Sequence, residues 1–166
     1  MDLQTAVDGE LVANQYTYDP DTWPPALAGI VAGAIAAMVA ATIGWILTTT
    51  AIDSPHEFAN SLTIVIVAIV LGFISGSLWR KLRATDNARM VFGWTLAGGF
   101  VATIAAVLIA DQTVVRSLAP FAVPLVAIVF ITLAFFTPLL STVRSPRWIA
   151  TLPVLLSLAI GIGLFV

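Results

Sequence analysis

Five long apolar stretches follow one another along the chain, and none contains an Asp, Glu, Lys, Arg or His residue. About 20 apolar residues in an α-helix cross a hydrocarbon core of about 30 Å, and a helix satisfies its own backbone hydrogen bonds there. The pattern therefore predicts an all-α, polytopic helical membrane protein with about five transmembrane helices in one compact bundle. The expected spans are 26–48, 62–79, 90–110, 121–140 and 148–166.

Two of these spans depart from a regular crossing helix. Pro124 and Pro138 lie inside 121–140 and predict a bend or a frayed turn, because proline removes a backbone donor. The last span, 148–166, rises only about 28 Å at about 1.5 Å per residue. A short, partly inserted helix is the alternative for this segment.

The composition fits the lipid environment and excludes several classes of protein. Hydrophobic residues make up 60% of the 166 residues and charged residues 10%, whereas soluble domains carry about 25% charged residues. The chain has no cysteine, which excludes disulfides, thiolate metal sites and iron–sulfur clusters. The net charge is −2 and does not suggest nucleic-acid binding.

The first 24 residues form a polar, acidic segment with neither the basic start nor the early apolar stretch of a cleaved signal peptide. We expect 1–24 to be a tail and 25–166 to be the transmembrane bundle. Trp23 is expected at the membrane interface, and the two prolines that follow it suit the first turn of a helix.

Basic residues predict the orientation. One connection, between the second and third spans, carries Arg80, Lys81, Arg83 and Arg89, and the connection before the last span carries two more arginines, whereas Arg116 alone is expected in a loop on the opposite side. The positive-inside rule then places the N-terminus in the cytoplasm and the C-terminus at the outer face of the cell membrane. The same four residues are expected to anchor the topology and to contact anionic lipid headgroups, with Trp79 at headgroup level.

Small residues recur at intervals of three or four in the first three spans, which aligns them on one face of each helix. Such stripes let two helix backbones approach closely in lipid, so they are the candidate helix-packing residues. Either the stripes face one another within the chain, or at least one meets another subunit. The stripes are Gly29, Gly33, Ala37, Ala40 and Gly44, then Ala68, Gly72 and Gly76, then Gly98, Ala102 and Ala106.

Candidate catalytic chemistry is sparse. Ionisable residues within a bilayer usually mark proton relays or ion pathways, and the predicted spans contain none. The loop 53–57 holds Asp53, His56 and Glu57, which could ligate a metal, but three close ligands without a fourth favour a solvated turn. No cofactor is expected. The hydroxyls of Thr42, Thr95, Thr103, Thr132 and Ser157 are expected to bond back to helix carbonyls, so they need not line a pore.

These observations favour a non-catalytic integral membrane subunit of a larger complex, with a structural, assembly or accessory role. Its expected partners are other integral membrane subunits and membrane lipids. An energy-converting complex is suggested by the class of protein and not by any residue. The alternatives are a small oligomeric transporter or channel for a neutral or lipophilic substrate, and an integral membrane enzyme with catalytic groups in its loops.

Overall fold

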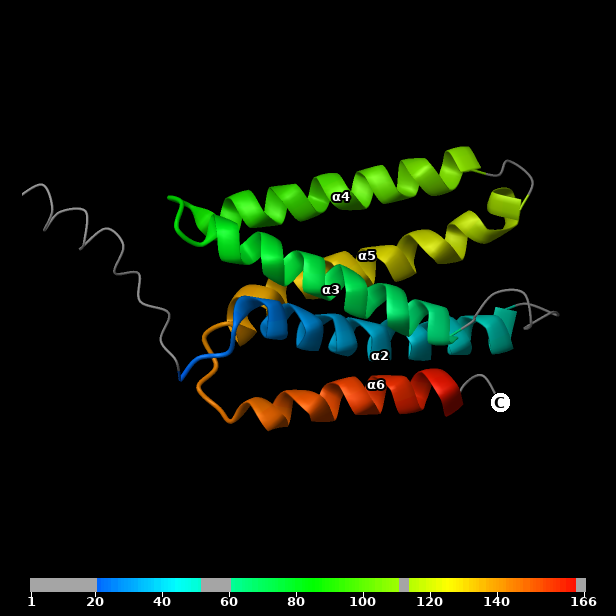
Figure 1. Cartoon of the computed structure of the whole chain (residues 1–166). Coiled ribbons are helices and arrows are strands. Elements are labelled where there is room, and N and C mark those ends of the chain that lie inside the picture. The colour runs from blue at the N-terminus through cyan, green and yellow to red at the C-terminus, as the bar shows by residue number, and fades with distance from the viewer. Residues whose placement is uncertain (1–20, 52–60, 111–113, 164–166) are drawn as a thin grey trace, which may run out of the picture.

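The computed structural model describes residues 21–51, 61–110 and 114–163, and these residues form a bundle of five α-helices without strands (Figure 1). The prediction of an all-α helical bundle is confirmed. The helices are α2 (Pro25–Ala51), α3 (Ser61–Leu82), α4 (Ala88–Ala110), α5 (Val114–Leu140) and α6 (Thr151–Gly163), with a short 3₁₀ helix, η2 (Arg147–Ala150), before α6. The tail before residue 21 and the loop 53–57 lie outside the described residues.

Four helices, α2 to α5, are long and apolar enough to cross a membrane. The first three match the predicted spans closely. Helix α5 begins at Val114 and not at 121, so Arg116 lies in this helix and the prediction that placed it in a loop was wrong. The α5 helix bends near its start (Figure 1), and its first half contains two prolines, Pro120 and Pro124. Proline in a membrane helix is tolerated at such bends because neighbouring groups satisfy the freed carbonyl.

The C-terminal segment is not one continuous helix from residue 148. It begins as η2 and continues as α6, and within the described residues the two together cover Arg147–Gly163, which is shorter than any of the four long helices. The structure therefore shows a short helix in this position, which was the alternative to a fifth full span.

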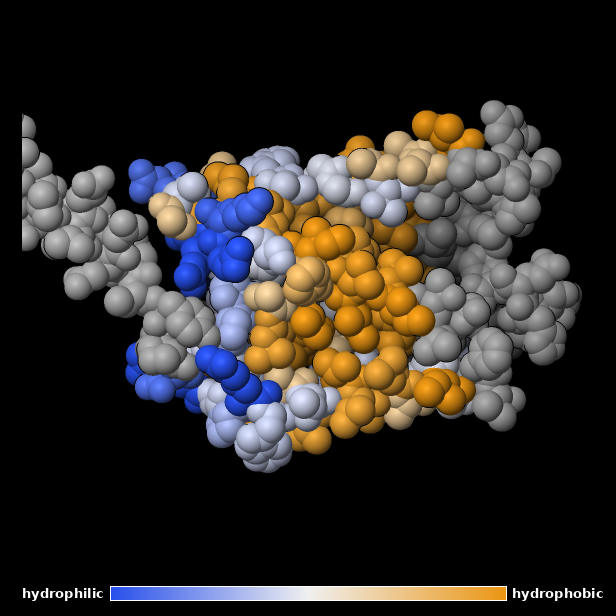
Figure 2. Space-filling model, viewed as in Figure 1, coloured by the Kyte–Doolittle hydropathy of each residue, from blue (hydrophilic) through white to orange (hydrophobic). Residues whose placement is uncertain are grey.

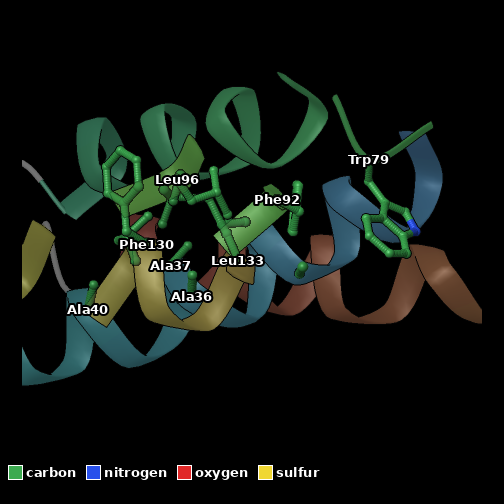
Figure 3. Packing of buried hydrophobic residues seen from close by; sticks show 12 residues of the cluster. Ala36, Ala37, Ala40, Trp79, Phe92, Leu96, Phe130 and Leu133 are labelled. Atoms are coloured by element: carbon green, nitrogen blue, oxygen red, sulfur yellow. The ribbon is translucent and has the colours of Figure 1, made fainter. Parts of the chain in front are cut away.

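Helix α2 lies at the centre of the bundle. It contacts α3, α5 and α6, and alanines surround it on most sides, so three neighbours can approach it at once. Larger side chains from the other helices complete the core (Figure 3), among them Trp79, Phe92, Phe130 and Leu133. The buried alanines of α2 are Ala28, Ala32, Ala34, Ala36, Ala37, Ala40 and Ala41.

Helix α4 lies at the edge of the bundle, packed on α5 and in contact with α3 (Figure 1). The two helices α3 and α4 diverge away from the loop that joins them. Within this loop Asn87 adopts a positive φ of 59°, a conformation that asparagine tolerates better than most residues. The carbonyl of Asn87 accepts the first α4 hydrogen bond, from the backbone N–H of Val91.

The connection between α3 and α4 and the one between α5 and α6 lie at the same end of the bundle, which we call the basic end (Figures 1 and 2). It carries Arg80, Lys81, Arg83 and Arg89 from the first connection, and Arg144 and Arg147 from the second. Antiparallel packing of successive helices brings these residues together. The end is hydrophilic, while the middle of the visible face is hydrophobic (Figure 2).

The two tryptophans expected at the membrane interface are both buried within the chain. Trp23 is 4% exposed, and its indole Nε1 donates a hydrogen bond of 2.8 Å to the Ser145 carbonyl. Trp79 is 7% exposed, and its Nε1 donates a hydrogen bond of 2.9 Å to the Ser141 hydroxyl. An indole can be buried when its N–H finds a partner, and here the connection between α5 and α6 supplies both acceptors.

Candidate functional site

The closest helix contact in the bundle is between α2 and α3. Gly29 and Gly33 of α2 lie directly against Ala68, Gly72 and Gly76 of α3. A Cβ atom added at Gly72 would meet the carbonyl oxygen of Gly29 and would lie 2.9 Å from the Cα of Gly33. Real Cβ contacts are not this short, so this interface exists because neither helix has side chains there.

The other small residues of α2 lie beside α5 as well as α3. Ala37 and Ala40 are fully buried in the core cluster that includes Val129 and Phe130 of α5. A Cβ atom added at Gly44 would lie 3.5 Å from the Leu125 side chain, which is an ordinary contact. The α2 stripe thus makes backbone contact with α3 near the basic end, and farther along it is covered by side chains of both α3 and α5.

The small residues of α4 face outward. Gly98, Ala102 and Ala106 are all exposed, and a Cβ atom added at Gly98 would meet nothing within 4 Å. The interpretation that all three stripes face one another within the chain is therefore wrong for α4. Its buried side carries the large residues Phe92 and Leu96, which pack on the rest of the bundle and turn the small side away from it.

We call the side of α4 that carries Gly98 and Ala102 its outer face, and we define it by its exposed residues. Apart from the Thr95 hydroxyl, which donates a hydrogen bond to the Val91 carbonyl, it is apolar, and it combines small residues with one large aromatic ring, Trp94, which is 70% exposed. Gly98 lies one turn after Trp94, so the ring stands beside a flat strip of small side chains. The outer face of α4 comprises Val91, Trp94, Thr95, Gly98, Val101, Ala102, Ala105 and Ala106.

A separate apolar pocket of about 280 Å³ opens where α3 and α4 diverge. Its walls come mainly from α3 and α5, with Ile64, Val67, Leu125 and Val126 among the lining residues. Thr103 of α4 is its single hydroxyl-bearing residue, and that hydroxyl donates a hydrogen bond of 2.8 Å to the Gly99 carbonyl. The pocket therefore offers hydrocarbon surface and no unpaired polar group.

Searches against protein-family models, curated proteins and solved structures find no match to this chain. The assignment of function thus depends on the surfaces described here.

The four basic residues predicted to anchor the topology, Arg80, Lys81, Arg83 and Arg89, are exposed at the basic end. Among the described residues, none of their side chains has a carboxylate partner. They are therefore available to anionic groups outside this chain, such as lipid headgroups. Residues that could hold a metal ion do not gather in groups of three or more within the described part of the chain.

The structure also contains a buried polar contact that the sequence did not point to. The hydroxyls of Ser75 in α3 and Thr137 in α5 lie 3.1 Å apart within hydrogen-bonding distance, and both residues are almost fully buried. One turn closer to the basic end, the Ser141 hydroxyl accepts from Trp79 and donates to the Pro138 carbonyl at 2.7 Å. These bonds join α3 to α5.

Three of the five hydroxyls expected to bond back to helix carbonyls do so, whereas Thr42 and Thr132 show no such bond within the described chain. Those of Thr95, Thr103 and Ser157 donate hydrogen bonds to carbonyls three or four residues earlier in their own helices, at 2.8 Å each. Self-satisfied hydroxyls are compatible with a hydrocarbon environment. The membrane-spanning part of the described chain thus presents packing surfaces and hydrocarbon-lined depressions.

Proposed function

We propose that this chain is a non-catalytic integral membrane subunit, with a structural, assembly or accessory role, that joins another membrane protein through the outer face of α4. The observation that supports this most directly is the open position of Gly98 within an exposed, small-residue strip. The strip resembles the one that brings α2 and α3 together, but it has no helix against it within the described chain.

Helices associate in a bilayer through close packing, because the surrounding lipid is itself apolar. Lipid tails are as apolar as leucine, so apolar exposure alone does not drive helices together in a bilayer. Close van der Waals packing does, and it requires small residues that let backbones approach. Trp94 adds a large surface beside the strip, and such aromatic anchors often dominate interface energies. A second transmembrane helix could use both features at once.

The geometry of α4 makes this surface accessible. Helix α4 is the least buried of the four long helices: 11% of its apolar segment is buried, against 56% for α2. Its contacts with the chain are confined to one side, through Phe92 and Leu96. A helix held from one side presents the other to any neighbour in the membrane.

The test is to purify the tagged chain from its native membrane in a mild detergent and to determine the mass of the intact particle. We expect other membrane chains at fixed stoichiometry. The double substitution Gly98→Leu, Ala102→Leu should remove these chains, because two leucines would hold a facing backbone several ångströms away.

Helix α6 offers a matched control. Gly163 and Ala159 are also exposed in an apolar helix, and a Cβ atom added at Gly163 meets nothing within 4 Å. Gly163→Leu with Ala159→Leu adds the same atoms and should leave the complex intact. A wild-type particle that contains only a monomer would refute the subunit proposal, and equal loss with both double variants would refute the role of the outer face.

A second candidate function rests on the pocket between α3, α4 and α5. Its volume of about 280 Å³ and hydrocarbon lining suit a small lipophilic substrate, which would make the chain a small oligomeric transporter or channel. A particle composed solely of copies of this chain would favour that function over the subunit. Flux of a lipophilic probe in proteoliposomes, blocked by Val126→Trp in the pocket wall, would then support it.

A further inference from the structure

One side of α4 forms a groove with α5 that is distinct from the outer face. At the basic end Arg89 lines a depression with Ala134, Phe135, Pro138 and Leu139. A second depression continues from Ala134 toward the middle of the bundle, and it is lined by Gly93, Leu96, Ala97, Phe100, Ala127, Phe130, Ile131 and Ala134. Since Ala134 belongs to both, they form one groove along the two helices.

Small residues make this groove deep, and large ones form its rim. Gly93 and Ala97 of α4 lie opposite Ala127 and Ala134 of α5, and a Cβ atom added at Gly93 would meet nothing within 4 Å. Ile131 and Phe135 stand at the rim, 68% and 70% exposed. The groove therefore has hydrocarbon walls and is open to the surroundings along its length.

The length and charge of the groove indicate what fills it. From Arg89 to Phe100 the helix rises about 16 Å at about 1.5 Å per residue, close to half of a hydrocarbon core of about 30 Å. The groove therefore spans one leaflet, with its single cation at the headgroup end. Arg89 is exposed, and no carboxylate of the described chain pairs with it.

We propose that this groove binds one phospholipid with an anionic headgroup, from the leaflet at the basic end. An acyl chain lies along Gly93, Ala97 and Ala134, and the phosphate contacts the Arg89 guanidinium. Guanidinium groups bind phosphate oxygens through paired hydrogen bonds, and basic pockets between transmembrane helices recognise anionic lipid headgroups. This lipid site goes beyond the function proposed above, and it does not depend on whether α4 binds a partner chain.

The test uses the full chain in nanodiscs made of equal parts phosphatidylglycerol and phosphatidylcholine with identical acyl chains. After transfer to mild detergent, native mass spectrometry counts the lipids that remain on each protein. Wild type is expected to retain one phosphatidylglycerol in preference to phosphatidylcholine. Arg89→Gln should lower this preference about fivefold, while Gly93→Leu should lower retention of both lipids because its side chain fills the groove.

Two matched controls separate the groove from general effects. Arg83→Gln removes a neighbouring exposed charge that does not line the groove, and Gly98→Leu adds the same side chain on the outer face of α4. Both should retain the lipid. Thermal unfolding of each variant verifies that it is folded.

Several outcomes would overturn the site: no lipid retained by the wild type, no preference for phosphatidylglycerol, equal loss with Arg83→Gln and Arg89→Gln, or full retention by Gly93→Leu. The two proposals fail separately. Loss of partner chains in the Gly98→Leu, Ala102→Leu variant, with unchanged lipid in Gly93→Leu, would keep the subunit function and reject the lipid site. The converse pattern would keep the lipid site alone.

Discussion

Helices α2 and α4 carry the same arrangement of small residues but use it differently. In α2, Gly29 and Gly33 lie against the backbone of α3, and a methyl group cannot be added without a clash. In α4, Gly98 lies in open space at the edge of the bundle. The comparison teaches that a small-residue strip gives a helix the capacity for close approach, while the neighbouring side chains decide whether the approach occurs within the chain.

The difference between the two helices follows from their other faces. Helix α2 has small residues on nearly all sides, so every face can become an interface, and three helices surround it. Helix α4 has Phe92 and Leu96 on one side, and these large residues pack into the core of the bundle. Its small side is left outside as a consequence.

The largest effect is expected from Gly72→Ala in the interface between α2 and α3. The new methyl group would meet the Gly29 carbonyl and the Gly33 Cα, which are backbone atoms and cannot rotate away. We expect the free energy of unfolding to fall by about 3 kcal/mol, at the upper end of the range for overpacking. Unfolding in mixed micelles measures this value. A loss below about 0.5 kcal/mol, the size of an ordinary surface substitution, would show that the two helices do not touch at Gly72.

An intermediate effect is expected where α4 is attached to the bundle. Trp79 of α3 packs edge-to-face against Phe92 of α4, with 5.2 Å between ring centroids, and also donates to Ser141. Trp79→Phe removes the hydrogen bond and part of the buried ring but leaves Ser141 bonded to the Pro138 carbonyl. We expect a loss of about 1.5 kcal/mol in the free energy of unfolding.

Trp148→Phe is the control for this substitution, because Trp148 is 65% exposed at the same end of the bundle. Its loss should stay within about 0.5 kcal/mol. Equal losses at both positions would show that the Trp79 contact does not hold α3, α4 and α5 together.

The smallest effect is expected from Gly98→Ala on the outer face of α4. This is the same chemical change as Gly72→Ala, but the added methyl group meets nothing. Alanine also favours helix over glycine, so the isolated chain should be unchanged or stabilised by up to about 1 kcal/mol. A loss similar to that of Gly72→Ala would show that the strip of α4 is packed in the isolated chain, and the comparison between the two helices would fail.

Hydrophobic patterning predicted the helices well because each apolar stretch must form its own backbone hydrogen bonds in lipid. The first three helices begin and end within a few residues of the predicted spans. The start of α5 was misplaced because Arg116 suggested a loop, although a charged residue can lie in the first turn of a helix near the membrane surface. The orientation of the bundle in the membrane remains a prediction.

The surfaces around α4 were less predictable from sequence. Trp23 and Trp79 are of the residue type that is common at membrane interfaces. Their burial depends on hydrogen-bond acceptors from the connection between α5 and α6, more than 60 residues away in sequence. The contact between Ser75 and Thr137 had no sequence signal, since isolated hydroxyls in apolar helices usually bond to their own backbone. Likewise the groove beneath Arg89 requires that α5 place Ala134 opposite Gly93.

The sequence by itself determined the all-helical, membrane-embedded class, the approximate helices and the residues small enough for close approach. These are local properties: a run of apolar side chains, a cap, a repeat of three or four residues. Only the tertiary structure decided that the strip of α2 meets α3, that the strip of α4 faces outward, and that Arg89 stands at the head of an apolar groove. Those outcomes depend on which large side chains find the better fit among several helices, and packing of that kind is a property of the whole bundle.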